Sequence, residues 1–180
     1  ASYIWRTHPK MLSPIPLSPP AAGATAILNS GSGAQRQADV AERLSAIFAE
    51  RGSNLRIRLA RKPLDLYAHA RAAVAENCPV VLAGGGDGTI SAVASVLAGT
   101  RSALGVLPLG TFNYFARMLG IPLELEAAVR VCFEGEVRFV SLGEVNGRIF
   151  LNNASLGLYP TVLRLREETD EYAHPRRPWL

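Results

Sequence analysis

Strand-like and helix-like patterns alternate along residues 24–133, and this alternation limits the fold more than any other feature of the chain. Short apolar runs are typical of buried strands, and the segments between them repeat apolar residues at helical spacing. Strands joined through helices pair in parallel within one sheet. We therefore predict an α/β fold with a mostly parallel sheet flanked by helices. The expected strands are residues 24–28, 55–59, 79–83 and 103–107, and the expected helices are residues 40–48, 64–77, 89–97, 112–119 and 125–133.

The two ends of the chain have a different character. Prolines recur in residues 1–22, which we expect to form a tail. From about Glu136 the pattern changes, because residues 137–141 alternate like a strand and Asn146-Gly147 separates two strand-like runs, a strong hairpin signal. We predict a tail at 1–22, an α/β domain at 23–135, and the beginning of an incomplete β-rich domain at 136–180.

Composition narrows the class of protein. With 48% hydrophobic and 19% charged residues, the chain is a globular domain with a real core. Neither a membrane span of about 18 apolar residues nor a signal-peptide core is present, so we expect a cytosolic protein. The two cysteines, Cys78 and Cys132, lie in apolar surroundings and are interpreted as buried thiols.

The net charge of +4 leaves two interpretations open. It describes either an ordinary solvated surface or a face that meets anionic phosphates or an anionic membrane. Aromatic residues do not interleave with the basic ones, which disfavours a nucleic-acid partner.

Loops rich in glycine follow the first, third and fourth expected strands, at residues 29–33, 84–89 and 109–113. The carboxyl ends of parallel strands meet at one edge of a sheet, where ligands gather. Glycine lets backbone N–H groups approach a phosphate, and the dipole of the following helix favours negative charge there. The three loops together predict a polyphosphate site.

The type of phosphate loop follows from the residues that are missing. No lysine follows the glycines, which excludes an ordinary P-loop NTPase, and Thr89 stands where a dinucleotide fingerprint needs a small residue. Asp87 would repel a bare pyrophosphate, but it suits a site in which Mg²⁺ stands between carboxylate and phosphate. A simpler alternative is that the loop only turns the chain, with Asp87 as N-cap of the next helix.

The segments "GGGDGT" and "LGVLPLGTFNYFARMLGIP" resemble the catalytic domain of the diacylglycerol kinase and sphingosine kinase superfamily, especially its bacterial lipid kinases. The resemblance covers residues 24–158. GGDGT is shared with NAD kinases, whereas the second segment is much more specific. The resemblance implies a Rossmann-like nucleotide-binding sheet followed by a β-sandwich on the lipid side, of which residues 136–180 would supply the first strands.

The resemblance also implies roles for single residues. The three loops would surround ATP, Asp87 would face Mg²⁺, and Asn113 would order the third loop. Three residues depart from the family pattern: Ser30 stands where a proline is usual, Ala60 where a threonine is frequent, and Tyr114 where an aspartate is frequent. Tyr114 is also explained simply as an aromatic on a helix that packs the core. The implied nucleotide-binding residues are Asn29, Ser30, Gly31, Ser32, Gly33, Gly85, Gly86, Asp87, Gly88, Thr89, Gly110, Thr111 and Asn113.

The implied function is an ATP- and Mg²⁺-dependent lipid kinase that phosphorylates a lipid hydroxyl, of diacylglycerol or a related lipid, in phospholipid metabolism. Its base would lie beyond Leu180, so we expect this chain alone to bind nucleotide without turnover. His8, His69 and His174 have no acid partner at a motif spacing and are interpreted as surface or helix-packing histidines.

A cytoplasmic protein that docks peripherally on an anionic membrane fits a basic chain without a membrane span. The acceptor lipid and the oligomeric state stay open, a homodimer being one alternative. The rival functions are an NAD kinase and a nucleotide-binding module without catalysis. A Rossmann dehydrogenase is weaker, because no acidic residue ends the second strand to hold a ribose.

Overall fold

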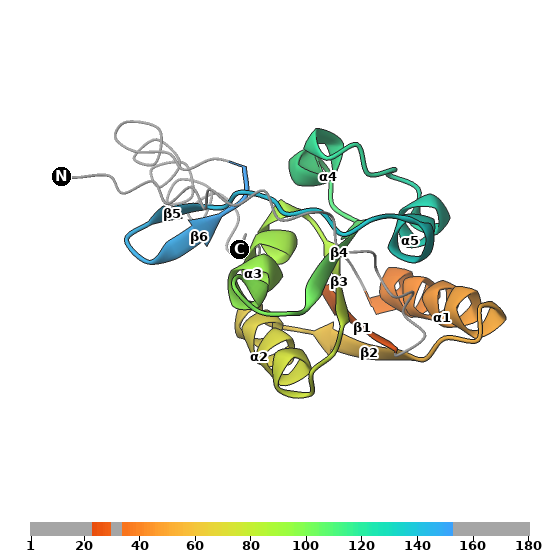
Figure 1. Cartoon of the computed structure of the whole chain (residues 1–180). Coiled ribbons are helices and arrows are strands. Elements are labelled where there is room, and N and C mark those ends of the chain that lie inside the picture. The colour runs from red at the N-terminus through yellow and green to blue at the C-terminus, as the bar shows by residue number, and fades with distance from the viewer. Residues whose placement is uncertain (1–22, 30–33, 153–180) are drawn as a thin grey trace, which may run out of the picture.

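A computed structural model describes residues 23–29 and 34–152 of the chain, and its centre is a parallel sheet with helices on both faces (Figure 1). The sheet has four strands in the order β2-β1-β3-β4. All neighbouring strands run parallel. The predicted α/β fold class is confirmed. The strands are β1 (Ala24–Asn29), β2 (Leu55–Ala60), β3 (Val80–Gly85) and β4 (Ala103–Pro108).

The helices divide the core into two layers, one on each face of the sheet. Helices α2 and α3 cover one face, and α1 and α5 cover the other (Figure 1). Central strand β3 is buried along its whole length, as its unbroken apolar run predicts. The helices are α1 (Ala34–Glu50), α2 (Pro63–Ala75), α3 (Asp87–Leu97), α4 (Tyr114–Met118) and α5 (Leu125–Glu134).

The strand order reverses between β1 and β3. From β1 the chain first adds β2 on one side, and then returns to add β3 and β4 on the other. Such a reversal leaves a crevice at the carboxyl ends of the two strands, because the connections leave in opposite directions. The loops after Asn29 and Gly85 therefore begin at the switch point of this sheet.

The end of the described chain forms the predicted hairpin. Strands β5 (Gly143–Val145) and β6 (Arg148–Phe150) pair antiparallel. Asn146 and Gly147 connect them with φ angles of 51° and 75°. The prediction of a strand at residues 137–141 is wrong. Val137 forms an isolated bridge, and residues 138–141 form no strand. Alternation marked these residues as extended, but no described partner strand completes a ladder.

Two further expectations need correction. The helix expected at residues 112–119 is shorter, because Asn113 has a left-handed backbone (φ 53°) and α4 begins only at Tyr114.

Cys132 is buried, which raises the pKa of its thiol to about 11. Cys78 is only half-buried, and its thiol lies 3.2 Å from the Val80 carbonyl oxygen. The tail at 1–22 and residues 153–180 lie outside the described part of the chain.

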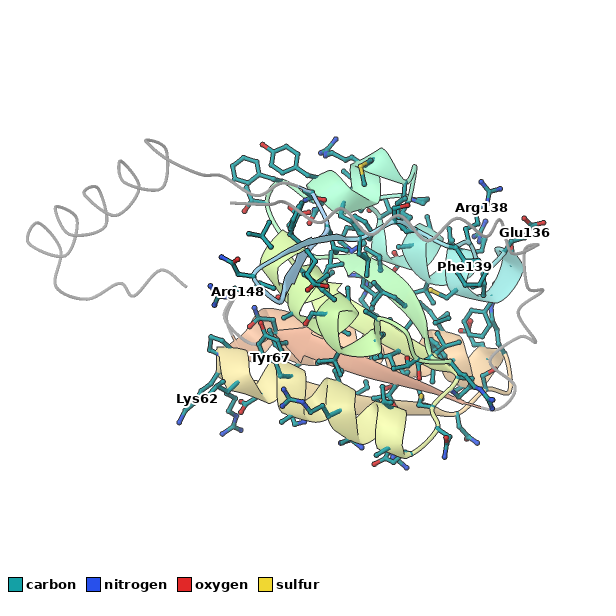
Figure 2. The ribbon with its side chains drawn as sticks, turned by 60° about the vertical axis from the view of Figure 1, so that its left-hand side comes forward. Lys62, Tyr67, Glu136, Arg138, Phe139 and Arg148 are labelled. Atoms are coloured by element: carbon teal, nitrogen blue, oxygen red, sulfur yellow. The ribbon has the colours of Figure 1, made fainter. Side chains whose placement is uncertain are left out.

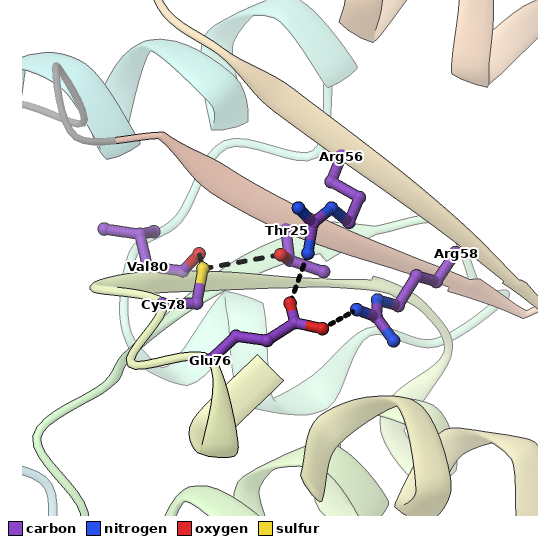
Figure 3. A network of polar contacts seen from close by, with 6 residues as sticks. All are labelled: Thr25, Arg56, Arg58, Glu76, Cys78 and Val80. Atoms are coloured by element: carbon purple, nitrogen blue, oxygen red, sulfur yellow. Dashed lines mark hydrogen bonds and ion pairs between the residues drawn. The ribbon is translucent and has the colours of Figure 1, made fainter. Parts of the chain in front are cut away.

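Ion pairs and a thiol hold the amino end of the sheet (Figure 3). Glu76 follows the last turn of α2 and accepts hydrogen bonds from Arg56 and, at 2.6 Å, from Arg58 of β2. Cys78 lies 3.4 Å from the Thr25 hydroxyl in the same region. The two guanidinium groups, Arg58 foremost, lower the pKa of Glu76. This network fastens α2 to the edge strand, far along the strands from the glycine-rich loops.

Candidate functional site

The ends of β1 and β3 are joined by a hydrogen bond between side chains. Asn29, the last residue of β1, donates from its amide to the Thr89 hydroxyl at 2.9 Å. Thr89 lies in the first turn of α3 and is 4% exposed. A Cβ atom on Gly85 would lie 2.5 Å from the Thr89 hydroxyl oxygen, so this close packing requires glycine. Asn29, the first residue of the first predicted loop, therefore meets the second predicted loop at the switch point.

The loop after β4 presses directly on the loop after β3. A Cβ atom on Gly110 would lie 2.3 Å from the Gly86 Cα atom, which is backbone and cannot turn aside. Asn113 closes its own loop: its side chain accepts from the Gly110 N–H at 3.0 Å and donates to the Gly110 carbonyl at 2.8 Å. It also donates to the Pro108 carbonyl at 3.3 Å. Two glycine loops thus lie in backbone contact.

Asp87 connects α3 to α4. Gly86 is the N-cap residue of α3, and Asp87 is its first residue. The Asp87 carboxylate accepts from the backbone N–H groups of Tyr114 at 3.1 Å and Phe115 at 2.9 Å. It also accepts from the Asn152 side chain at 3.1 Å. Asp87 is therefore not the N-cap of its own helix; its carboxylate serves the first amides of α4.

These hydrogen bonds decide the charge state of Asp87. Its partial burial opposes ionisation, but the N–H groups of Phe115 and Tyr114 and the Asn152 amide outweigh that effect, and the pKa of Asp87 is lowered. The carboxylate is consequently ionised at neutral pH. A fixed negative charge thus stands where α3 begins.

The amides at the start of α3 are placed to meet an anion. The first N–H groups of a helix have no partner within it, and the helix dipole adds positive potential there. Gly88 has open space around its Cα, since an added Cβ would meet nothing within 4 Å. Gly85 and Gly110 permit close packing of the loops, whereas Gly88 leaves the approach to the helix open. Tightly packed loops with an open approach to the helix N-terminus suit the binding of a phosphate group.

The described residues could supply only a small part of the ligands of a Mg²⁺ ion. They contain no group of three or more His, Cys, Asp or Glu side chains that could hold a metal ion. In the described part of the chain Asp87 is the carboxylate at this edge, and three donors already occupy its oxygens. Mg²⁺ commonly keeps water and phosphate ligands and takes only one or two carboxylates. The donor set fits an ion that is held mainly by phosphate and water, with Asp87 as the protein ligand.

The sequence-predicted residues divide into three groups. Asn29, Gly85, Gly86, Asp87, Thr89, Gly110 and Asn113 are brought together by the contacts above. Gly88 and Thr111 lie exposed at the same edge. Ser30, Gly31, Ser32 and Gly33 lie outside the described residues.

Two of the three departures from the family pattern lie in the described part of the chain. Ala60 is buried at the end of β2. Tyr114 is 59% exposed, and its ring stacks on Phe112 with centroids 5.4 Å apart. The Tyr114 side chain therefore does not pack the core, contrary to the simpler interpretation. His69 lies on α2 with Nε2 3.3 Å from the Leu59 carbonyl oxygen, and His8 and His174 lie outside the described residues.

Sequence reasoning missed the link between Asp87 and α4, and the part of Asn152 in it. The Asn113 side chain is hydrogen-bonded within its own loop, so the first amides of α4 need another acceptor. An acceptor at Asp87, 27 residues earlier, has no local signature. Asn152 is separated from Asp87 by 65 residues and has no motif around it.

Comparisons with known proteins agree with one another. The sequence profile described as "Diacylglycerol kinase catalytic domain" matches residues 23–145. A curated protein of Pseudomonas aeruginosa, "Probable lipid kinase YegS-like", is 42% identical over 126 residues, which are 68% of this chain and 41% of that protein. A protein of Yersinia enterocolitica with the same name is 35% identical over 126 residues, 68% of this chain and 42% of its own length.

Solved structures give the same result. A crystal structure described as a diacylglycerol kinase from Bacillus anthracis superposes with a TM-score of 0.61 at 26% identity. The match covers 72% of this chain and 50% of that one. The chain thus spans about two fifths of the curated relatives and half of the solved structure. Among residues 23–29 and 34–152, no helix has the length and apolarity to cross a bilayer.

Proposed function

The chain belongs to the diacylglycerol kinase catalytic domain family, and on that premise we propose that it is the nucleotide-binding part of an ATP-dependent lipid kinase. The enzyme transfers the γ-phosphate of ATP to the hydroxyl of diacylglycerol or a related lipid. The curated relatives named as lipid kinases, at 35–42% identity, support this assignment. The segment "LGVLPLGTFNYFARMLGIP", which contains Gly110 and Asn113 and is more specific to the family than GGDGT, also supports the assignment.

The observation that carries the proposal is the interlocked edge of the sheet. Three strand ends are held within hydrogen-bond or backbone contact by Asn29–Thr89, Gly86–Gly110 and Asp87–Phe115. Loops held this way lose little further entropy when a ligand binds, because their geometry is already set. In this proposal the amides of Gly88 and Thr89 bind phosphate oxygens, and Asn113 keeps the neighbouring loop in place.

Phosphoryl transfer needs positioning and charge neutralisation more than covalent chemistry from the protein. Mg²⁺, when bound with the nucleotide, would supply part of the neutralising charge. Asp87 has a second task in this proposal, because it keeps α4 and Asn152 beside the phosphate loop while remaining ionised. The base for the acceptor hydroxyl would belong to the lipid-side domain that the family resemblance implies.

The acceptor sets the place of action. A lipid hydroxyl lies at a bilayer surface, so we propose peripheral docking of a cytoplasmic protein on an anionic membrane. The net charge of +4 supports such docking.

The test is a transfer assay on the polypeptide that carries this domain at its natural length. It is incubated with radiolabelled ATP, Mg²⁺ and vesicles that contain diacylglycerol, monoacylglycerol or sphingosine, and lipid and aqueous phases are counted separately. Label in a phospholipid product is expected. A parallel arm offers NAD in place of lipid. Label in NADP with none in lipid would overturn the lipid assignment in favour of an NAD kinase.

A third readout, the binding of Mg-ATP, distinguishes a kinase from a non-catalytic nucleotide-binding module. Binding of Mg-ATP without product in any arm would show a nucleotide-binding module and would contradict the kinase proposal. Ala60 and Tyr114 are the positions to restore in that case, as Ala60→Thr and Tyr114→Asp, because they depart from the family pattern. Recovery of turnover by either variant would identify which departure matters.

A further inference from the structure

A separate cleft of about 880 Å³ lies beside the candidate nucleotide site. Its walls come from α2, α3 and the β5–β6 hairpin, and Gly88 is the described residue at which it touches the glycine-rich edge. The volume is that of a small-molecule site. None of the contacts described for the nucleotide edge uses this cleft, so its chemistry has to be explained separately.

The charged groups that the described residues contribute to the cleft are all positive. Arg71 comes from α2 and Arg148 from β6, so two guanidinium groups line one cleft from separate elements. Among residues 23–29 and 34–152, no Asp or Glu lines the cleft, and neither arginine makes an ion pair or hydrogen bond with any of these residues. Some arginines elsewhere in the structure do pair, as Arg58 does with Glu76, whereas the side chains of Arg61, Arg101 and Arg130 pair with no described residue. Two unpaired guanidinium groups that share a cleft favour an anion.

Figure 2 shows the position of this charge. Arg148 and Tyr67 lie near one another on one side of the molecule, with Lys62 at the start of α2 on the same side. Arg138 lies on the opposite side, near Glu136. Asp87 lies at the start of α3 and is not among the residues that line the cleft; its carboxylate is hydrogen-bonded to the amides of α4.

The rest of the lining is part polar and part apolar. Tyr67 and Ser91 line the cleft, and their hydroxyls make no hydrogen bond to a described residue. Val74, Val96 and Ile149 supply apolar surface. A ligand that satisfies this lining carries an anionic head with several acceptor oxygens and an apolar body.

From these features we propose that the cleft between α2, α3 and the β5–β6 hairpin binds a phosphate-bearing ligand, with Arg71 and Arg148 holding the phosphate. A phosphate monoester has three acceptor oxygens, enough for two guanidinium groups and the Ser91 hydroxyl. The apolar lining then contacts the part of the ligand next to the phosphate. The site is independent of the proposed phosphoryl transfer and holds whether or not that reaction is confirmed.

Isothermal titration calorimetry without nucleotide tests the site. The probes are dioctanoyl phosphatidic acid below its micelle concentration, glycerol 3-phosphate, and uncharged dioctanoylglycerol. We expect phosphatidic acid to bind, dioctanoylglycerol not to bind, and Arg71→Gln and Arg148→Gln each to weaken phosphatidic acid about tenfold, through loss of one charge-assisted contact. Comparable binding of glycerol 3-phosphate would identify a water-soluble phosphate ester as the ligand source.

The controls separate the cleft from general electrostatics. Arg138→Gln removes the same charge on the opposite side and should leave the affinity unchanged. Ala75→Glu places a carboxylate on an exposed helical position of the lining and should abolish binding while preserving the fold, since Glu is a good helix former. No binding of either phosphate probe, or equal binding by the wild type and the Arg71, Arg148 and Ala75 variants, would overturn the proposal.

Discussion

The two ends of the four-stranded sheet are held together by different chemistry. At the amino end, Glu76 reaches Arg56 and Arg58 through long charged side chains that are partly in solvent (Figure 3). At the carboxyl end, the contacts are glycine backbone against backbone and short polar side chains against backbone amides. Long side chains tolerate shifts of their partners, whereas backbone contact at Gly86 and Gly110 does not. The comparison predicts that the carboxyl end is rigid and intolerant, as a preorganised site should be.

The largest effect is expected from Gly110→Ala. The new Cβ would meet the Gly86 Cα at 2.3 Å, so the two loops must separate. We expect a loss of about 1–3 kcal/mol in unfolding free energy, as for overpacked positions, and loss of measurable ATP binding. Chemical denaturation and nucleotide titration measure the two effects.

Gly88→Ala is the matched stability control for that variant. An added Cβ meets nothing within 4 Å, and Gly88 lies inside α3. Its stability should stay equal to the wild type or rise by about 0.5–1 kcal/mol, because alanine favours a helix. Equal destabilisation by Gly110→Ala and Gly88→Ala would show that close loop contact is not what makes this end intolerant.

Asn113→Ala should come next in size. Asn113 is 5% exposed, makes three hydrogen bonds within its loop, and has a left-handed backbone. Alanine loses the bonds and strains the backbone, for a loss of about 2 kcal/mol in unfolding free energy. Asn113→Gly loses the same hydrogen bonds but adopts the left-handed backbone without strain. The difference in unfolding free energy between the two variants therefore measures the backbone strain. Identical unfolding free energies for both would show that strain contributes nothing.

Asp87→Asn tests the link between α3 and α4. The amide keeps the shape but loses the charge and one acceptor, and because the site is partly solvated we expect a loss of about 1 kcal/mol. The pKa of Asp87 is lowered in the folded protein, so its contribution is present above the unfolded value of about 3.9 and is lost as pH falls through the folded value.

The Tm difference between the wild type and Asp87→Asn should therefore be full at pH 7 and shrink below about pH 4. Thermal unfolding between pH 7 and pH 3 measures it. A difference that grows towards acid pH would contradict the bonding described for Asp87.

The smallest effect belongs to the amino end. Glu76→Gln removes an exposed ion-pair partner of Arg56 and Arg58, and the pKa of Glu76 is lowered, foremost by its hydrogen bond to Arg58. Exposed pairs contribute little, so Tm should fall by less than about 2 °C at low salt and by less in 1 M NaCl. A larger fall than that of Asn113→Ala would reverse the comparison between the two ends.

Much of this architecture follows from local sequence pattern, and the long-range contacts do not. Periodicity located all the strands of the parallel sheet to within a few residues, because buried parallel strands are continuous apolar runs. Asn146-Gly147 fixed the hairpin by its turn chemistry. The late start of α4 could not be predicted, since it depends on Asn113 taking a left-handed backbone to bond its own loop.

Single site residues show the same limit. Glycine spacing indicated that the loops at Gly85 and Gly110 serve one edge, but the need for glycine at each position lies in its neighbour across space. The charge of Asp87 suggested a ligand, whereas its bonds to Tyr114 and Phe115 are visible only in three dimensions. The cleft lined by Arg71 and Arg148 joins residues far apart in the chain and carries no motif.

The most direct test of the account is an amide chemical-shift titration of the ¹⁵N-labelled protein with Mg-ATP. The amides of residues 85–89 and 110–113, at the carboxyl end of the sheet, should shift in a saturable way, while those of Glu76, Cys78 and Val80 at the amino end stay in place. Shifts confined to the amino end, or no saturable shift at residues 85–89, would contradict a nucleotide site at the switch point.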